Sequence, residues 1–152
     1  MITLPSPREA ETILGPEAWK RLRLLLDAIR SAPFRAVGPR EDDRIMDEII
    51  LDSLAPVFLG LMERDAVVSG IDFGAGFGIP TLPLAAVLER SRFIAVDSAT
   101  KRIAFGREIA GRIGLTGATF KEQRLDIDQV QRRGDSLPSW LRDADLYLSR
   151  AM

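Results

Sequence analysis

The chain has 152 residues, 46% of them apolar and 28% charged, with a net charge of −1, which is typical of one soluble globular domain. It contains no His and no Cys, so the sequence excludes imidazole bases, cysteine nucleophiles, disulfides and the usual zinc sites. No apolar run is long enough to span a bilayer, and the N-terminus has no signal-peptide pattern. We therefore expect a cytoplasmic protein that binds neither a membrane nor a metal, and whose oligomeric state the sequence leaves open.

Two helical regions are predicted in the first 65 residues. Residues 7–31 carry leucines and isoleucines at helical spacing, and Pro33 ends the pattern. Residues 41–64 carry a second apolar stripe, which we expect Pro56 to kink or split. We assign residues 1–65 to an N-terminal helical region.

From residue 66 onward, short apolar segments alternate with helical segments. Strands are predicted at 66–73, 92–97, 118–125 and within 143–152, and helices at 81–90 and 98–115, with Ser98 as the N-cap of the second helix. This alternation predicts an α/β fold with a parallel, doubly wound sheet. We assign residues 66–152 to this core and expect it to lack its last strands, since the pattern stops at the fourth. The whole chain forms one domain.

A glycine-rich turn follows the first predicted strand. Gly74, Gly76 and Gly78 stand at alternate positions, and the third glycine of a dinucleotide fingerprint would fall at Ile79. Glycine lets the backbone pass close to a ligand, and the following helix start favours an anionic group. The turn thus indicates either a cofactor site other than a dinucleotide site, or a plain tight connection.

Acidic residues stand at three successive strand ends. Asp72 lies in the first strand, Asp97 ends the second, and Asp126 follows the third. An acid at the second position can accept hydrogen bonds from ribose hydroxyls, and one at the third can reach an adenine amino group. Together with the glycine turn, they favour S-adenosylmethionine, whose ammonium and sulfonium groups are positive. Read alone, Asp97 could equally cap the next helix.

Four segments resemble, in order, the sequence blocks of one enzyme family. They are "ILDSLAP" (50–56), "DFGAGFGIPTLPLA" (72–85), "VDSATKRIAFGREIAGRIGL" (96–115) and "LSRAM" (148–152). The family is RsmG/GidB, the small-subunit (16S) rRNA guanine-N7 methyltransferases. The resemblance implies a Rossmann-like, class I S-adenosylmethionine-dependent methyltransferase. It also implies that small-subunit rRNA or the 30S subunit is the partner.

The resemblance also assigns roles by position. It implies that Gly74 and Ile79 line the cofactor loop, that Asp97 binds the ribose, and that Leu125 and Asp126 flank the adenine. The complete predicted cofactor set is Asp72, Gly74, Gly76, Gly78, Ile79, Asp97, Leu125, Asp126 and Arg150.

Arg150 and Asp52 are the predicted catalytic residues. The resemblance implies that Arg150 lies in the catalytic mouth, which Asp52 could face from its helix. From the residues alone, Arg150 could equally pair with a nearby acid such as Asp145, and Asp52 could be an ordinary solvated helix residue.

The chain departs from the family pattern at several positions. Glu48 and Ile49 stand where the family helix has Arg and His, and Thr81 replaces a glycine of the loop. Loss of an arginine near the RNA entrance weakens phosphate contact. A methyltransferase acting on a small molecule therefore stays open as an alternative, which the acidic pI of about 5.6 also favours. An adenosyl-binding protein without activity is a further alternative, favoured by the expected lack of the last strands. Guanine N7 has a lone pair and no proton, so the absence of His and Cys is compatible with N7 methylation.

Overall fold

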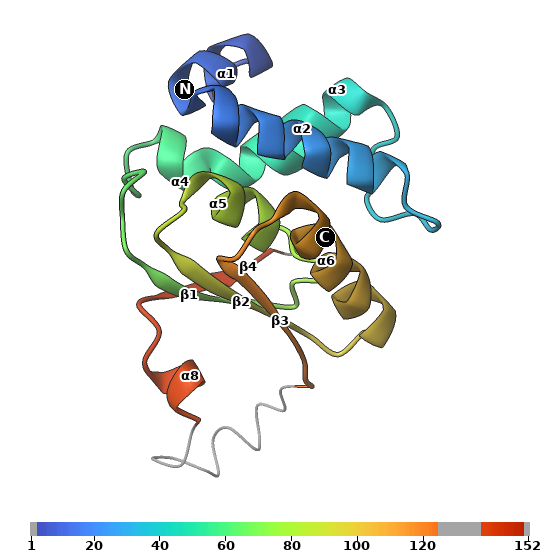
Figure 1. Ribbon diagram of the computed structural model, residues 1–152, viewed down its shortest axis with the longest axis vertical. Coiled ribbons are helices and arrows are strands. Elements are labelled where there is room, and N and C mark those ends of the chain that lie inside the picture. Colours follow the sequence, from blue (N-terminus) through green and yellow to red (C-terminus); the bar gives the residue numbers. More distant parts are fainter. Residues whose placement is uncertain (1–2, 125–137, 151–152) are drawn as a thin grey trace.

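The computed structural model describes residues 3–124 and 138–150 of the chain. Its sheet has four parallel strands in the order β3-β2-β1-β4 (Figure 1). The strands are β1 Ser69–Phe73, β2 Arg92–Asp97, β3 Ala118–Glu122 and β4 Leu146–Ser149. The chain winds outward from β1 to β3 and then returns to the other side of β1. This reversal between β1 and β4 is the place where open parallel sheets bind ligands.

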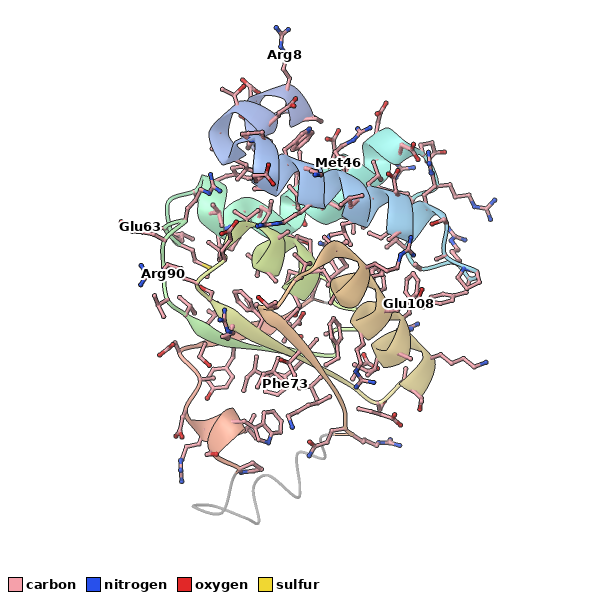
Figure 2. All side chains as sticks on the ribbon, viewed as in Figure 1. Arg8, Met46, Glu63, Phe73, Arg90 and Glu108 are labelled. Atoms are coloured by element: carbon pink, nitrogen blue, oxygen red, sulfur yellow. The ribbon has the colours of Figure 1, made fainter. Side chains whose placement is uncertain are left out.

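Helices cover both faces of the sheet, as predicted for a doubly wound fold. The crossovers α5 (Thr81–Val87) and α6 (Thr100–Ile113) lie on one face, beneath the N-terminal helices (Figure 1). On the other face, α8 (Ser139–Arg142) contributes Leu141 to a small apolar cluster. Phe73 of β1 packs against that cluster, between the sheet and α8 (Figure 2). The main core therefore lies on the α5–α6 face.

The first predicted helical region forms two helices, α1 (Pro7–Leu14) and α2 (Pro16–Arg30). Gly15 separates them with φ of 82°, a conformation that glycine adopts without strain. Pro16 then opens α2, where the missing N–H of proline costs no helical hydrogen bond. The predicted helical region 7–31 is therefore helical on both sides of Gly15, and these two residues divide it into two helices.

The second predicted helical region is divided further. It comprises α3 (Asp42–Ile45), the π-helical segment η1 (Met46–Leu51), the 3₁₀ turn η2 (Asp52–Leu54) and α4 (Ala55–Phe58). Pro56 lies in the first turn of α4, so the predicted split at this residue is confirmed. None of the helices in the described ranges has the length and apolar character needed to cross a bilayer.

The predicted start of α6 was wrong by two residues. Its N-cap is Ala99, and the Ala99 N–H donates to Oδ1 of Asp97 at 2.8 Å. The α6 N-cap has no side-chain cap hydrogen bond, so the predicted capping by Ser98 was wrong. At the other end, Gly114 has φ of 75° and ends the helix in the left-handed conformation.

Candidate functional site

The glycine turn connects β1 to α5, and its three glycines meet different surroundings. Gly74, Gly76 and Gly78 all have positive φ, between 59° and 110°, which side-chain-bearing residues rarely adopt. A Cβ on Gly74 would stand in open space, whereas a Cβ on Gly78 would lie 2.9 Å from the Phe120 ring. Gly74 therefore lies at the open side of the turn, and Gly78 lies against the core.

Asp97 ties the end of β2 to this turn. Its Oδ2 accepts a hydrogen bond from the Gly76 N–H at 2.8 Å, and its Oδ1 accepts the one from Ala99. The half-buried carboxylate therefore positions the glycine turn and holds the N–H of Ala99. It makes no capping hydrogen bond to the first turn of α6, so the capping alternative was wrong. Each carboxylate oxygen has a second acceptor site, so Asp97 retains the capacity to bind ribose hydroxyls.

A cleft of about 280 Å³ opens beside Asp97, at the carboxyl ends of β1, β2 and β3. Its lining residues are Phe73, Gly74, Val96, Asp97, Ser98, Gln123 and Arg124. Sequence reasoning missed Gln123 and Arg124, whose signal was their place directly after the third strand. Leu125 and Asp126 follow Arg124 but lie outside the described residues, so their adenine contacts stay predictions.

Asp72 is sealed beneath the turn, with no exposed surface. Its Oδ2 accepts hydrogen bonds from the hydroxyl of Thr81 at 2.8 Å and from the Thr81 N–H at 3.3 Å. Oδ1 is buried and has no partner among the described residues. Burial raises the pKa of Asp72 to about 7, against the lowering effect of the Thr81 hydrogen bonds, and the nearby charge of Asp97 raises it further. Near neutral pH, the protonated and the ionised forms of Asp72 are therefore both populated.

Two further residues shape the turn from the core side. Ile79 is 1% exposed and packs in the main core, so its side chain supports the turn from below. Gly106 of α6 lies so close to the turn that a Cβ there would be 2.2 Å from the Phe77 carbonyl oxygen. Sequence reasoning missed Gly106, and its only signal was a glycine inside an amphipathic helix.

The two predicted catalytic residues lie together, away from Asp145. Nη2 of Arg150 and Oδ2 of Asp52 are 3.0 Å apart. Arg150 also donates to the Glu48 carbonyl at 2.8 Å and to the Ser53 hydroxyl at 3.1 Å. The alternative partner was wrong, because Asp145 instead accepts the Ser69 N–H at 2.8 Å.

The acceptors of Arg150 belong to the irregular helical segment. Glu48 lies in the π-helical η1, and Asp52 and Ser53 lie in η2. A π-helical turn displaces the regular hydrogen-bond ladder, so a carbonyl there is more accessible to a guanidinium group. Arg150 thus joins the end of β4 to the N-terminal helical region.

Glu48 stands at the position of the family arginine, and its side chain pairs with Arg44. Arg44 donates to both oxygens of Glu48, at 2.7 Å and 3.0 Å, and lowers the pKa of that exposed carboxyl. Within residues 3–124 and 138–150, no group of three or more acidic side chains is arranged to hold a metal ion.

Comparison with known proteins shows which family the sequence matches. A family model described as "GidB: rRNA small subunit methyltransferase G" matches residues 25–151. A protein of that name from Oleidesulfovibrio alaskensis is 31% identical over 91% of this chain and 58% of its own length. The one from Shewanella amazonensis is 32% identical over 76% of this chain and 53% of its own length. The aligned part thus spans little more than half of these relatives.

Proposed function

Because the chain belongs to the rRNA small subunit methyltransferase G family, we propose that it transfers a methyl group from S-adenosylmethionine to N7 of a guanine in 16S rRNA. The proposed partner is small-subunit rRNA or the 30S subunit, and the proposed location is the cytoplasm. One observation carries the proposal: Gly74 and Asp97 border the same cleft, at the carboxyl ends of adjacent parallel strands.

The residues around the cleft fit this cofactor. Asp97 has acceptor sites left for the two ribose hydroxyls. The backbone at Gly74 carries no Cβ that would obstruct the ligand. The unpartnered Oδ1 of Asp72 is a buried acceptor of the kind that an ammonium group satisfies. Under this proposal, Leu125 and Asp126 flank the adenine beyond Arg124.

The proposed reaction needs positioning more than acid–base chemistry. S-adenosylmethionine supplies an electrophilic methyl group, and the guanine N7 lone pair attacks it without losing a proton. Correct alignment of two reacting groups contributes roughly 7–11 kcal/mol to lowering a barrier. The chain's part is to hold the cofactor, to admit an unstacked guanine and to exclude water.

Arg150 and Asp52 are the proposed catalytic residues at the mouth. Arg150 is fixed by its contacts to Asp52, Ser53 and the Glu48 carbonyl, so its planar group is held in one orientation. A guanidinium of fixed orientation can donate to the O6 and N7 edge of a guanine or to the cofactor carboxylate. We propose that Asp52 sets this orientation.

The test is methyl transfer to 30S subunits isolated from cells that lack this methylation. With isotope-labelled S-adenosylmethionine, we expect label in 16S rRNA, and a full-length relative serves as positive control. Failure of label to enter the RNA, while the protein binds S-adenosylhomocysteine in calorimetry, would reject the RNA substrate and keep the cofactor site.

A small-molecule substrate is the second candidate. The segment 41–52 holds six acidic residues and a single basic one, Arg44, which is committed to Glu48. A negatively charged segment next to the mouth disfavours a polyanion such as RNA. Cofactor binding without transfer to 30S subunits would favour this candidate.

A further inference from the structure

Thr81 is placed where its polar groups serve a single carboxylate oxygen. It is fully buried and is the first residue of α5, whose seven residues are all buried. Its hydroxyl and its backbone N–H both donate to Oδ2 of Asp72. A hydroxyl costs free energy in such surroundings unless it is hydrogen-bonded, and Asp72 supplies that bond.

The other oxygen of Asp72 is left without a partner. Oδ1 is buried and accepts no hydrogen bond from the described residues. Buried side-chain oxygens in folded proteins nearly always have a partner. Asp72 does not itself line the cleft, but it directly precedes Phe73 and Gly74, which do, so its unpartnered oxygen is a candidate ligand contact. The two oxygens of Asp72 therefore differ: Thr81 donates hydrogen bonds to Oδ2, and Oδ1 stays available to a ligand.

We propose that Thr81 is a positioning residue for the cofactor: its hydroxyl fixes Oδ2 of Asp72, so that Oδ1 is presented to the amino group of S-adenosylmethionine. This inference rests on the proposed cofactor site and adds to it a residue whose side chain does not line the cleft. A glycine, which the family loop has at this position, would supply only the N–H. The hydroxyl is therefore a feature that this chain adds to the turn.

The charge on Asp72 decides whether this arrangement binds a cation. The pKa of Asp72 is about 7, so both charge states are populated near neutral pH, and Thr81 acts to favour the ionised one. Asp97 on β2 is the charged neighbour that opposes ionisation. The described parts of α5 and β4 carry no charged side chain, and Asp52 on η2, which packs against α5, is paired with Arg150.

The test compares two ligands across pH in the full chain. S-adenosylhomocysteine carries the amino group, and 5′-methylthioadenosine lacks the whole amino-acid part. The variants are Thr81→Val, which keeps the shape without the hydroxyl, and Thr81→Ser, which keeps the hydroxyl. Kd is measured by calorimetry from about pH 6 to about pH 8, which brackets the pKa of Asp72. Thermal unfolding checks that each variant is folded.

We expect Thr81→Val to weaken S-adenosylhomocysteine binding about tenfold at pH 7, as for loss of a hydrogen bond to a charged group. The wild-type affinity should fall as the pH drops through about 7, since protonated Asp72 cannot pair with an ammonium group. Without the hydroxyl, the pKa of Asp72 rises, so in Thr81→Val this fall should begin at a higher pH. Thr81→Ser should restore the wild-type profile, and 5′-methylthioadenosine should bind all three proteins equally.

Two results would overturn the role of Thr81. One is an equal loss for both ligands at every pH, which would mean that Thr81 only supports the turn. The other is a Thr81→Ser variant that behaves like Thr81→Val. Wild-type protein that binds neither ligand would instead reject the cofactor site itself, and the role of Thr81 with it.

Discussion

Asp72 and Asp97 are the same residue type on adjacent parallel strands, yet the fold places them in opposite surroundings. Asp72 lies inside β1, beside Ala95 of β2 and Leu148 of β4, and has no exposed surface. Asp97 is the last residue of β2, half-buried, and borders the cleft. In the strand register, Asp97 lies two positions beyond the partner of Asp72, and this shift separates a carboxylate enclosed by core residues from one at the rim.

The donors offered to the two carboxylates differ as well. Each oxygen of Asp97 accepts one backbone N–H, from Gly76 or Ala99. Both donors of Asp72 come from Thr81 and reach a single oxygen. Asp97 therefore organises the backbone around the cleft, whereas Asp72 takes its hydrogen bonds from one neighbour only.

The largest expected effect is on the pH dependence of stability, through Asp72→Asn. The folded-state pKa of about 7 is above the ordinary aspartate value of 3.8, so between these pH values the folded protein binds a proton that the unfolded chain does not. The free energy of unfolding should therefore decrease as the pH rises through this range, by about 4 kcal/mol at most. Asp72→Asn removes the proton uptake and should flatten this decrease, as measured by urea unfolding at about pH 5 and pH 8.

Asp65→Asn is the matched control, because Asp65 is exposed and lies outside the site. It should leave the pH dependence as in the wild type. If the free energy of unfolding falls equally with pH in Asp72→Asn and the wild type, burial does not raise the pKa of Asp72, and the prediction is wrong.

A somewhat smaller effect is expected from Asp97→Ala, on ligand affinity. The change removes the proposed ribose acceptor and frees the Gly76 N–H, so the glycine turn loses its support. Hydrogen bonds to charged groups contribute about 1.5–3 kcal/mol, so S-adenosylhomocysteine should bind roughly 10- to 100-fold more weakly in calorimetry. Asp65→Ala again serves as control, and unchanged affinity in Asp97→Ala would refute the ribose assignment.

The smallest effect is expected at a third carboxylate, Asp52, whose side chain is 52% exposed. Exposed ion pairs contribute about 0.2–1 kcal/mol, so Asp52→Ala should lower the free energy of unfolding by no more than that. Arg150→Met removes the contacts to Glu48 and Ser53 as well, and should cost about 1–3 kcal/mol. Urea unfolding of both variants checks the ranking, and equal losses would mean that the ion pair alone holds the segment.

The sheet and its turn were predictable because their signals are local and periodic. Alternating apolar segments gave the parallel strands, and the positive φ of Gly74, Gly76 and Gly78 matches their spacing. The π-helical stretch at 46–51 was not predictable, since its apolar stripe fits an α-helix equally well.

The contacts within the site were harder to predict than its location. The Thr81–Asp72 hydrogen bonds depend on the path of the turn between them. Arg150 donates to the main-chain carbonyl of Glu48. Every residue has such a carbonyl, so the sequence gives no signal for this contact. Gly106 is required because a Cβ at this position would lie 2.2 Å from the Phe77 carbonyl oxygen, and such constraints follow from packing alone.

The contact between Arg150 and Glu48 has a consequence for how the protein is made. It joins residues 102 positions apart in the chain. Contacts of such large sequence separation form late in folding, because the chain between them must first be ordered. On the ribosome, the N-terminal helices are synthesised first, and their contact with Arg150 can form only after β4 has been synthesised. The link between the end of β4 and η1 is therefore assembled last, after the strands that carry the glycine turn.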